Sequence, residues 1–132
     1  MNINSNNNLL AIFDPPPVYE PDGAGYTLDF EEEAQDGTTT PFDLAAVLPI
    51  TYRVKKYSDV VIVEKTIPDG QLSNDGMFIQ GDNNEVLAID IDAQDIEGVI
   101  NITHRHELIY TFADGTTKTF WRGDIPFKDL FS

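Results

Sequence analysis

Apolar and polar residues alternate along most of the chain after Tyr26, with the period of two that half-buried β-strands require. In one clear run, Ile50, Tyr52 and Val54 alternate with polar neighbours, and a second run extends over 86–91. The pattern predicts strands at 26–33, 49–56, 60–67, 77–80, 86–91, 99–112 and 116–127.

The last two predicted strands contain most of the candidate functional side chains. In 99–112 one face carries Ile100, Ile102, His104, His106, Leu108 and Tyr110. In 116–127 the alternation places Trp121, Ile125 and Phe127 inside and Lys118, Phe120 and Arg122 outside.

Turn residues separate the predicted strands. Five of the nine glycines follow an aspartate, at positions 23, 37, 70, 76 and 115. Asp-Gly favours the positive φ of tight hairpins. Only 92–98 suits a helical turn, with Asp92 or Asp95 as its cap and Gly98 as its end.

The first 24 residues have a different composition. They are rich in Asn, contain the apolar run 9–13, and continue with prolines at 15–17 and 21, which disfavour helices and central strands. We therefore predict an extended arm at 1–24. Residues 25–132 are predicted to form one all-β domain, an immunoglobulin-like antiparallel β-sandwich of about seven strands.

Charge narrows the classes of partner. The 132 residues include 23 acids and 8 bases, a formal net charge of -15, and no cysteine. Such a chain repels nucleic acid and anionic membranes at long range, and it has no thiolate for a metal site or a nucleophile. The sequence shows neither a signal peptide nor a run of ~20 apolar residues, so we expect a soluble protein.

The acids are unevenly distributed. Residues 1–52 hold nine acids and no base, which leaves fourteen acids and all eight bases, or -6, for the remaining 80 residues. Glu31, Glu32 and Glu33 are therefore expected to meet a basic partner surface. Phe120 beside Arg122 resembles the aromatic and cationic composition of protein interfaces.

Candidate metal and catalytic groups are few. His104 and His106 lie on the same predicted face, but they lack further His or Cys ligands, so packing is favoured over a zinc site. The acidic segments 82–85 and 90–97 lack the order of an EF-hand loop and suit a hairpin and a capped turn. No nucleophile motif or phosphate loop occurs, so we expect a protein without cofactor, metal or enzymatic activity.

Several short motifs follow one another in a familiar order. They are Asp36-Gly37, Pro41-Phe42-Asp43-Leu44, Ile50-Thr51-Tyr52-Arg53-Val54, the strand 60–67, Asp75-Gly76, Leu87-Ala88-Ile89-Asp90-Ile91, Ala93-Gln94, Gly98, His106-Glu107-Leu108-Ile109-Tyr110, Asp114-Gly115 and Trp121-Arg122-Gly123-Asp124-Ile125-Pro126-Phe127. In this order, over about 105 residues from Tyr26 onward, the chain resembles the small immunoglobulin-like domains of phage structural proteins, such as the N-terminal domain of upper baseplate proteins.

The resemblance implies a non-enzymatic virion component, an adaptor in the tail, neck, baseplate or fibre. Its expected partners are other phage structural proteins with basic surfaces, in a symmetric homo-oligomer assembled in the host cytoplasm. Residues 9–33 would lie along a neighbouring subunit, with Leu9, Leu10, Ile12 and Phe13 as apolar anchors. Capsid decoration is the alternative; an acidic nucleic-acid mimic and a calcium-dependent carbohydrate-binding module are also open.

Overall fold

The computed structural model describes residues 2–4, 11–12, 15, 18–20, 23–92, 94–95 and 102–129. Nearly all of its regular structure is β. The strands are β1 (Asn2–Asn4), β2 (Ala11–Ile12), β3 (Val18–Glu20), β4 (Ala24–Asp29), β5 (Glu31–Glu33), β6 (Thr39–Pro41), β7 (Ile50–Lys55), β8 (Val61–Ile67), β9 (Ser73–Asn74), β10 (Met77–Gln80), β11 (Val86–Ile91), β12 (Ile102–Thr111) and β13 (Thr117–Asp129).

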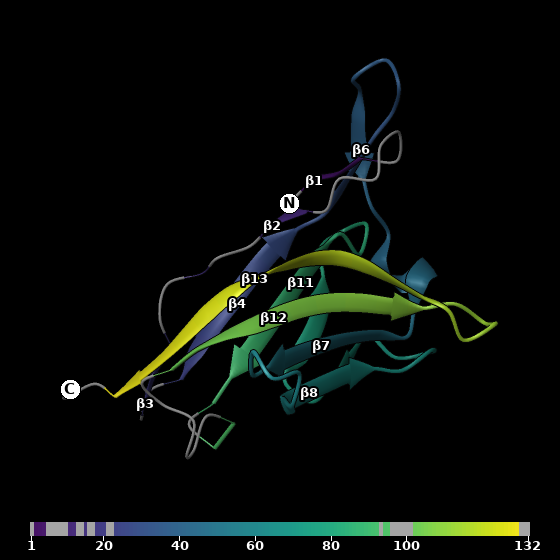
Figure 1. The fold of residues 1–132 in the computed structure, drawn as a ribbon. Helices are drawn as coiled ribbons and strands as arrows, with labels where there is room; N and C mark the ends of the chain where they lie inside the picture. The colour runs from purple at the N-terminus through teal and green to yellow at the C-terminus, as the bar shows by residue number, and fades with distance from the viewer. Residues whose placement is uncertain are drawn as a thin grey trace.

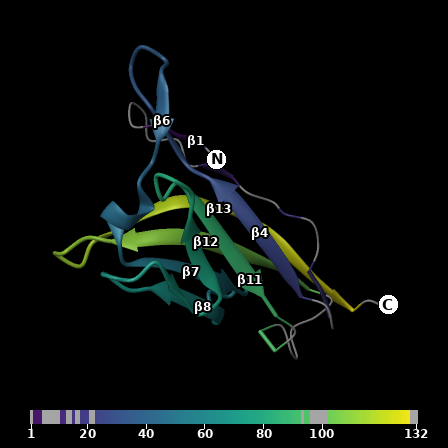
Figure 2. The same cartoon turned by 180° about the vertical axis from the view of Figure 1, so that it is seen from behind.

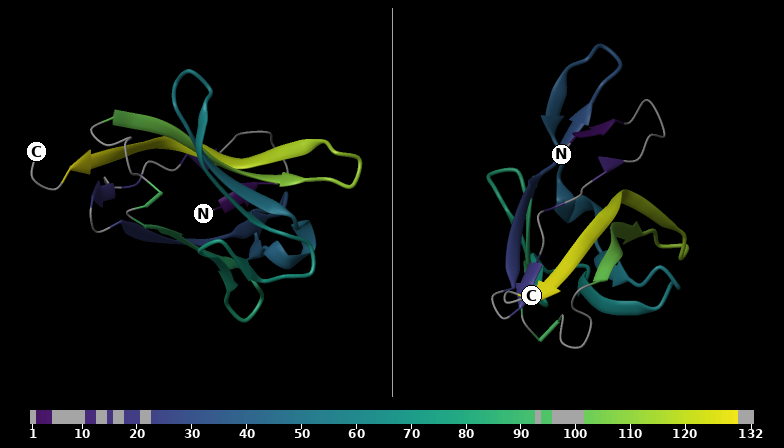
Figure 3. Two further views of the ribbon diagram at one scale, coloured as in Figure 1. Left: turned by 90° about the horizontal axis from the view of Figure 1, so that it is seen from below. Right: turned by 60° about the vertical axis from the view of Figure 1, so that its left-hand side comes forward.

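Two facing sheets form an immunoglobulin-like antiparallel β-sandwich, which confirms the predicted fold class (Figures 1 and 3). The larger sheet has the order β2-β13-β12-β7-β8, and β3 also pairs with β13. The smaller sheet has the order β4-β11-β10-β9 and lies nearer the viewer in Figure 2. Strands β7, β8, β10, β11 and β12 lie within the segments predicted for them.

Side chains from both sheets meet in one apolar core, because alternate residues of each strand face the opposite layer. Leu87, Ile89 and Ile91 of β11 are buried, as are Tyr52 and Val54 of β7. Trp121 has no exposed surface and is the largest buried side chain. The alternation that predicted these strands therefore corresponds to the observed core.

Phe120 is buried, so the predicted outward orientation of this ring is wrong. The register of β12 and β13 passes from the pair Leu108–Trp121 to the pair Ile109–Thr119, which leaves Phe120 without a cross-strand partner. Such a β-bulge adds one residue and shifts the alternation, so that two consecutive side chains face the same way. The Phe120 ring contacts Phe30 edge-on, with centroids 5.6 Å apart.

The predicted strand 26–33 is divided. Phe30 is fully buried and separates β4, in the smaller sheet, from β5, which belongs to a separate three-stranded sheet with β1 and β6. The hairpin of β5 and β6 projects away from the sandwich (Figures 1 and 3). Asp36 closes its turn by accepting hydrogen bonds from the hydroxyl and amide of Thr38, at 2.6 and 3.0 Å, and these lower the pKa of the Asp36 carboxyl.

Parts of the predicted arm pair with strands of the same chain. β1 pairs in parallel with β5, while β2 and β3 pair in parallel with β13. Residues 24–29, which were expected to lie along a neighbouring subunit, instead form β4 and pair with β11. The arm anchors Leu9, Leu10 and Phe13 lie outside the described residues.

The turn chemistry was predicted well. All five glycines of the Asp-Gly pairs have positive φ. A single turn of 3-10 helix at Leu44–Val47 was not predicted; Asp43 caps it by accepting a hydrogen bond from the amide of Ala45 at 2.9 Å. In the expected helical turn, Asp92 accepts hydrogen bonds from the amides of Gln94 and Asp95, whereas 96–98 lie outside the described residues.

None of the helical structure in the described part of the chain is long and apolar enough to cross a membrane.

Candidate functional site

The eight bases all belong to one layer of the sandwich. They lie in β7, β8, β12 and β13 or in the hairpin between β7 and β8: Arg53, Lys55, Lys56, Lys65, Arg105, Lys118, Arg122 and Lys128. The strands of the smaller sheet, and the β5–β6 hairpin, contain no base. Apart from Lys65, which is buried, these bases are exposed or half-buried, so the larger sheet and its hairpin are where an acidic group finds positive partners.

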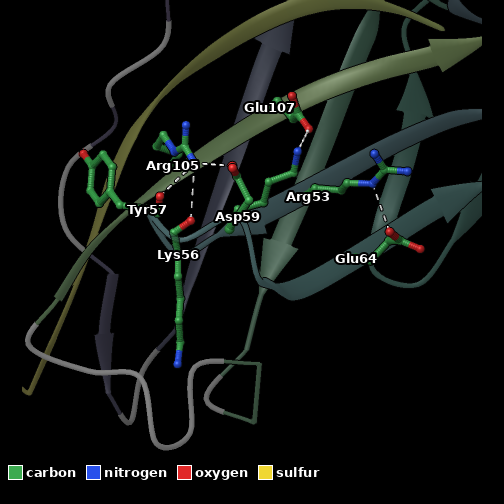
Figure 4. Close-up of polar contacts among 8 residues, drawn as sticks. Arg53, Lys56, Tyr57, Asp59, Glu64, Arg105 and Glu107 are labelled. Atoms are coloured by element: carbon green, nitrogen blue, oxygen red, sulfur yellow. Dashed lines mark hydrogen bonds and ion pairs between the residues drawn. The ribbon is translucent and has the colours of Figure 1, made fainter.

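Arg105 attaches the β7–β8 hairpin to this face (Figure 4). Its Nη2 donates to the backbone oxygens of Lys56 and Tyr57, at 3.5 and 3.3 Å, and to the carboxylate of Asp59. Asp59 has a φ of 67°, and its amide donates to the Lys56 carbonyl at 2.8 Å, which forms a tight turn. One side chain from β12 thus fixes a hairpin about 46–49 positions earlier in the chain.

Tyr57 lies in the turn of that hairpin, between β7 and β8, and 59% of its surface is exposed. Its hydroxyl donates to Asp124 Oδ1 at 2.7 Å, and the Arg105 guanidinium lies 5.4 Å from the ring centroid, a cation–π distance. The ring is therefore exposed and also held in place by two neighbours. Such an aromatic loses little side-chain entropy when a partner covers it.

Two further ion pairs connect neighbouring strands beside the hairpin (Figure 4). Arg53 Nε contacts Glu64 Oε2 at 2.9 Å, and Lys55 Nζ contacts Glu107 Oε1 at 2.8 Å. In the sheet register Glu107 stands directly between Arg53 and Arg122, yet its carboxylate is taken by Lys55. The guanidinium of Arg122 is left without an ion pair or hydrogen bond among the described residues.

A cleft of about 410 Å³ lies beside the hairpin, on the outer face of the larger sheet. Its lining includes the cations Lys55, Arg105 and Arg122 and the anions Asp59, Glu107 and Asp124. Each of the three anions has a partner inside the protein. The cleft lining therefore contains one guanidinium, that of Arg122, without an ion pair or hydrogen bond among the described residues, and each of its carboxylates already has a hydrogen-bond or ion-pair partner.

The two histidines are interior packing residues, as favoured from the sequence. His104 and His106 are buried, with rings 5.0 Å from Phe127 and 4.8 Å from Trp121 respectively. The Nδ1 of His106 and the Tyr52 hydroxyl are 3.0 Å apart, within hydrogen-bond distance. Among the described residues no group of three or more His, Asp or Glu is arranged to hold a metal ion.

Lys65 is a buried cation that the sequence did not single out. Its Nζ lies 3.1 Å from Asp95 Oδ2 and donates to the Asp75 carbonyl at 3.0 Å, so it connects β8 with the turn after β9 and the segment after β11. Burial, followed by the nearby Tyr26 and Asp95, raises the pKa of Tyr52, which pairs with Lys65 in the sheet. The ion pair between Lys65 and Asp95 connects the larger sheet with the segment that follows β11 of the smaller sheet.

The predicted contact residues are distributed over separate regions. Ile12 lies in β2, paired with Arg122 of β13, while Glu31, Glu32 and Glu33 form β5 in the projecting hairpin. Phe120 is buried in the core. Arg122, the exposed member of the predicted set on β13, lines the cleft.

The acidic segments form turns. In 82–85 the Glu85 carboxylate accepts a hydrogen bond from the amide of Asn83 at 2.8 Å, and Asn84 has a φ of 55°. Asp92 and Asp95 bind each other's backbone amides. Glu97 lies outside the described residues.

No feature of the sequence indicates that Tyr57 and Arg105 form a unit. They are 48 positions apart and become neighbours only because β7 and β12 pair antiparallel, with Lys55 opposite Arg105. Alternation alone could place Lys55, Arg105 and Arg122 on outer faces, and the pairing order of the strands could then have brought them together.

Comparison with known proteins assigns no family. No family model matches the chain, and no curated protein matches it. Eleven chains of solved structures match. One is CopC from Methylosinus trichosporium OB3b, with a TM-score of 0.44 and 10% sequence identity, covering 86% of this chain and 85% of that one. A similarity at this level assigns no function.

The function expected from the phage resemblance is corrected by this comparison. The solved structure named above is CopC from Methylosinus trichosporium OB3b, so the virion function predicted from the sequence is wrong. The residues on which that prediction depended are short turn and strand motifs, and any sandwich needs turns and strands of this kind.

Proposed function

We propose that the protein is a non-enzymatic binding module that docks another protein on the outer face of its larger sheet. The contact surface comprises the β7–β8 hairpin and the neighbouring cleft, and it includes Tyr57, Arg105 and Arg122. Tyrosine and arginine are the residue types that contribute most to protein interfaces.

One observation supports the proposal most strongly: Tyr57 is exposed and yet fixed. Its hydrogen bond to Asp124 and its stacking under Arg105 hold the ring upright beside a cleft large enough to admit a partner's side chain. Val60 and Val61, which follow the hairpin turn, are 54% and 43% exposed and extend the apolar part of the surface. An apolar area beside cations is typical of an interface rather than of open surface.

The proposal can be tested with a photo-crosslinking residue at Ser58, the hairpin position next to Tyr57. The full chain carrying this residue is expressed in its source cell and irradiated, and the crosslinked protein is identified. Its affinity for the purified chain is then measured. Tyr57→Ala should weaken that affinity at least about tenfold, because a central aromatic contributes about 2 kcal/mol or more.

Phe112→Ala is the matched control, since Phe112 is also an exposed aromatic, at 47%, but follows the opposite end of β12. It should leave the affinity within about twofold, as a substitution outside the interface does. Equal loss in both variants, or no crosslink at Ser58 above that from a probe at Asp114, would refute the docking surface.

A further inference from the structure

The cleft beside the hairpin is a binding site for a carboxylate group: we infer this from the way the sheet distributes its ion pairs. The inference rests on the proposed docking surface and specifies what its occupant presents. Four observations support it: the register, the absence of a partner for Arg122 among the described residues, the neighbouring Tyr57 ring, and the position of the bases in the fold.

The register explains why Arg122 is available. Glu107 is the cross-strand neighbour of both Arg53 and Arg122. Arg53 instead forms an ion pair with Glu64 on β8, and Glu107 forms an ion pair with Lys55. With both local acids engaged, Arg122 is the cation of this row whose fork has no carboxylate among the described residues.

The chemistry of the available group selects the ligand. A guanidinium presents parallel N–H donors that match the two oxygens of a carboxylate, and such bidentate pairs are stronger than single hydrogen bonds. The carboxylates beside it already have partners, because Asp59 forms an ion pair with Arg105 and Asp124 accepts a hydrogen bond from the Tyr57 hydroxyl. A cationic ligand therefore finds no carboxylate group without a partner in this lining.

The surroundings of the cleft indicate which chemical group the ligand carries beside its carboxylate. The lining of the cleft of about 410 Å³ includes Asp124 and Arg105, and these two residues also contact the exposed Tyr57 ring, which is not itself part of the lining. A ligand whose carboxylate binds Arg122 in the cleft can therefore contact Tyr57 only with an aromatic or apolar group that extends past Asp124 or Arg105. This describes an acidic side chain beside an apolar residue in a docked protein, or a free aromatic carboxylate.

The fold directs the ligand to this face. All eight bases of the chain belong to the larger sheet or its hairpin, so the acidic smaller sheet and the β5–β6 hairpin repel the same group. The net charge of -15 repels an anion at long range, and the larger sheet with its hairpin is the part of the chain where an anion that has arrived finds cations.

Nuclear magnetic resonance titration of the full chain tests the inference. Benzoate is one probe, benzamide is its neutral counterpart, and a short blocked peptide with Glu beside Phe is the protein-like probe. We expect benzoate and the peptide to shift the Arg122 Nε–H and Gly123 amide signals, and benzamide to leave them in place. A tighter peptide would indicate a protein carboxylate as the source, and a tighter benzoate a free small molecule.

Arg122→Gln should weaken the binding of either acid at least about tenfold, since hydrogen bonds to charged groups are worth about 1.5 kcal/mol or more. Lys118→Gln removes one exposed charge from the same strand outside the cleft lining, and it should change binding by less than about twofold. Arg122→Lys retains the charge without the fork and should bind less tightly than the parent.

Equal effects of Arg122→Gln and Lys118→Gln, or benzamide shifts as large as those of benzoate, would overturn the inference. The two proposals can fail separately. Carboxylate binding without any loss of partner affinity in Tyr57→Ala would refute the docking surface alone. Loss of partner affinity in Tyr57→Ala, with no carboxylate binding, would refute the carboxylate site alone.

Discussion

Tyr26 and Tyr52 couple the stability of the sandwich to alkaline pH. Burial raises the pKa of Tyr26 from 10.0 to about 12, and it also raises the pKa of Tyr52. A neutral phenol is therefore favoured in the folded state, while the unfolded chain ionises at its ordinary pKa of about 10. The stabilisation is complete below about pH 10 and is lost as the pH rises through the folded pKa.

We expect the free energy of unfolding in urea to be nearly level between about pH 7 and 9 and to fall above about pH 10. Tyr26→Phe should reduce the slope of that fall, because it removes one of the shifted groups. Phe78→Leu removes an exposed ring with no titrating group and should leave the slope unchanged. An identical slope in the parent and Tyr26→Phe would show that Tyr26 does not contribute.

Sequence reasoning was accurate for residues whose environment is set by their own strand. The alternation around Tyr52 and the positive φ at the Asp-Gly turns followed from local rules. It could not identify Lys65 as a buried cation, because the oxygens that neutralise it come from the turn after β9 and the segment after β11. A buried charge is recognisable only once its partners are known.

At the scale of elements, the β12–β13 bulge determines which side chains of β13 reach the core. The extra residue makes both Phe120 and Trp121 buried, although strict alternation would expose one of them. A bulge inserts a residue without a distinctive sequence signature, which is why the period of two predicted this strand correctly and its face at Phe120 wrongly.

Phe120→Ala should lower the free energy of unfolding by about 3–4 kcal/mol, the usual cost of removing a buried phenylalanine side chain. Phe78→Ala, on an exposed position of β10, should cost about 1 kcal/mol or less. Chemical denaturation of both variants measures the difference. A loss for Phe120→Ala no larger than that for Phe78→Ala would contradict the buried position.

At the scale of the whole molecule, Lys65 and Asp95 connect the two sheets. Their side chains are 10% and 23% exposed, whereas Arg53 and Glu64, within the larger sheet, are 33% and 51% exposed. A shielded pair whose one partner is removed leaves a charge that water solvates poorly, while an exposed pair contributes little.

We therefore expect Asp95→Asn to cost about 2–3 kcal/mol in the free energy of unfolding and Glu64→Gln to cost about 0.5 kcal/mol or less. Lys65→Met, combined with Asp95→Asn, should recover most of the loss, because no buried charge is then left unpaired. Thermal and urea unfolding test both points. Equal costs for Asp95→Asn and Glu64→Gln would show that the bridge between the sheets adds no more than a surface pair.

The sandwich class was predictable because seven short alternating segments separated by Asp-Gly turns fit few other architectures. The assignment of strands to layers was not predictable. The sequence pattern of β4 and β5 is that of one continuous strand, and the buried Phe30 between them is what separates the two. The binding face depended on that assignment. The cleft arises from three strands and a hairpin whose order in the sheet, β13-β12-β7-β8, differs from their order in the chain.

The confinement of every base to one layer gives the molecule a permanent electric dipole. On a support coated with amines, the acidic layer and the β5–β6 hairpin would face the solid, since they hold no base to oppose adsorption. The opposite layer, with the cleft and Tyr57, would then face the liquid. Simple ionic immobilisation would therefore orient the chain uniformly on a biosensor, with its proposed docking surface accessible to every analyte.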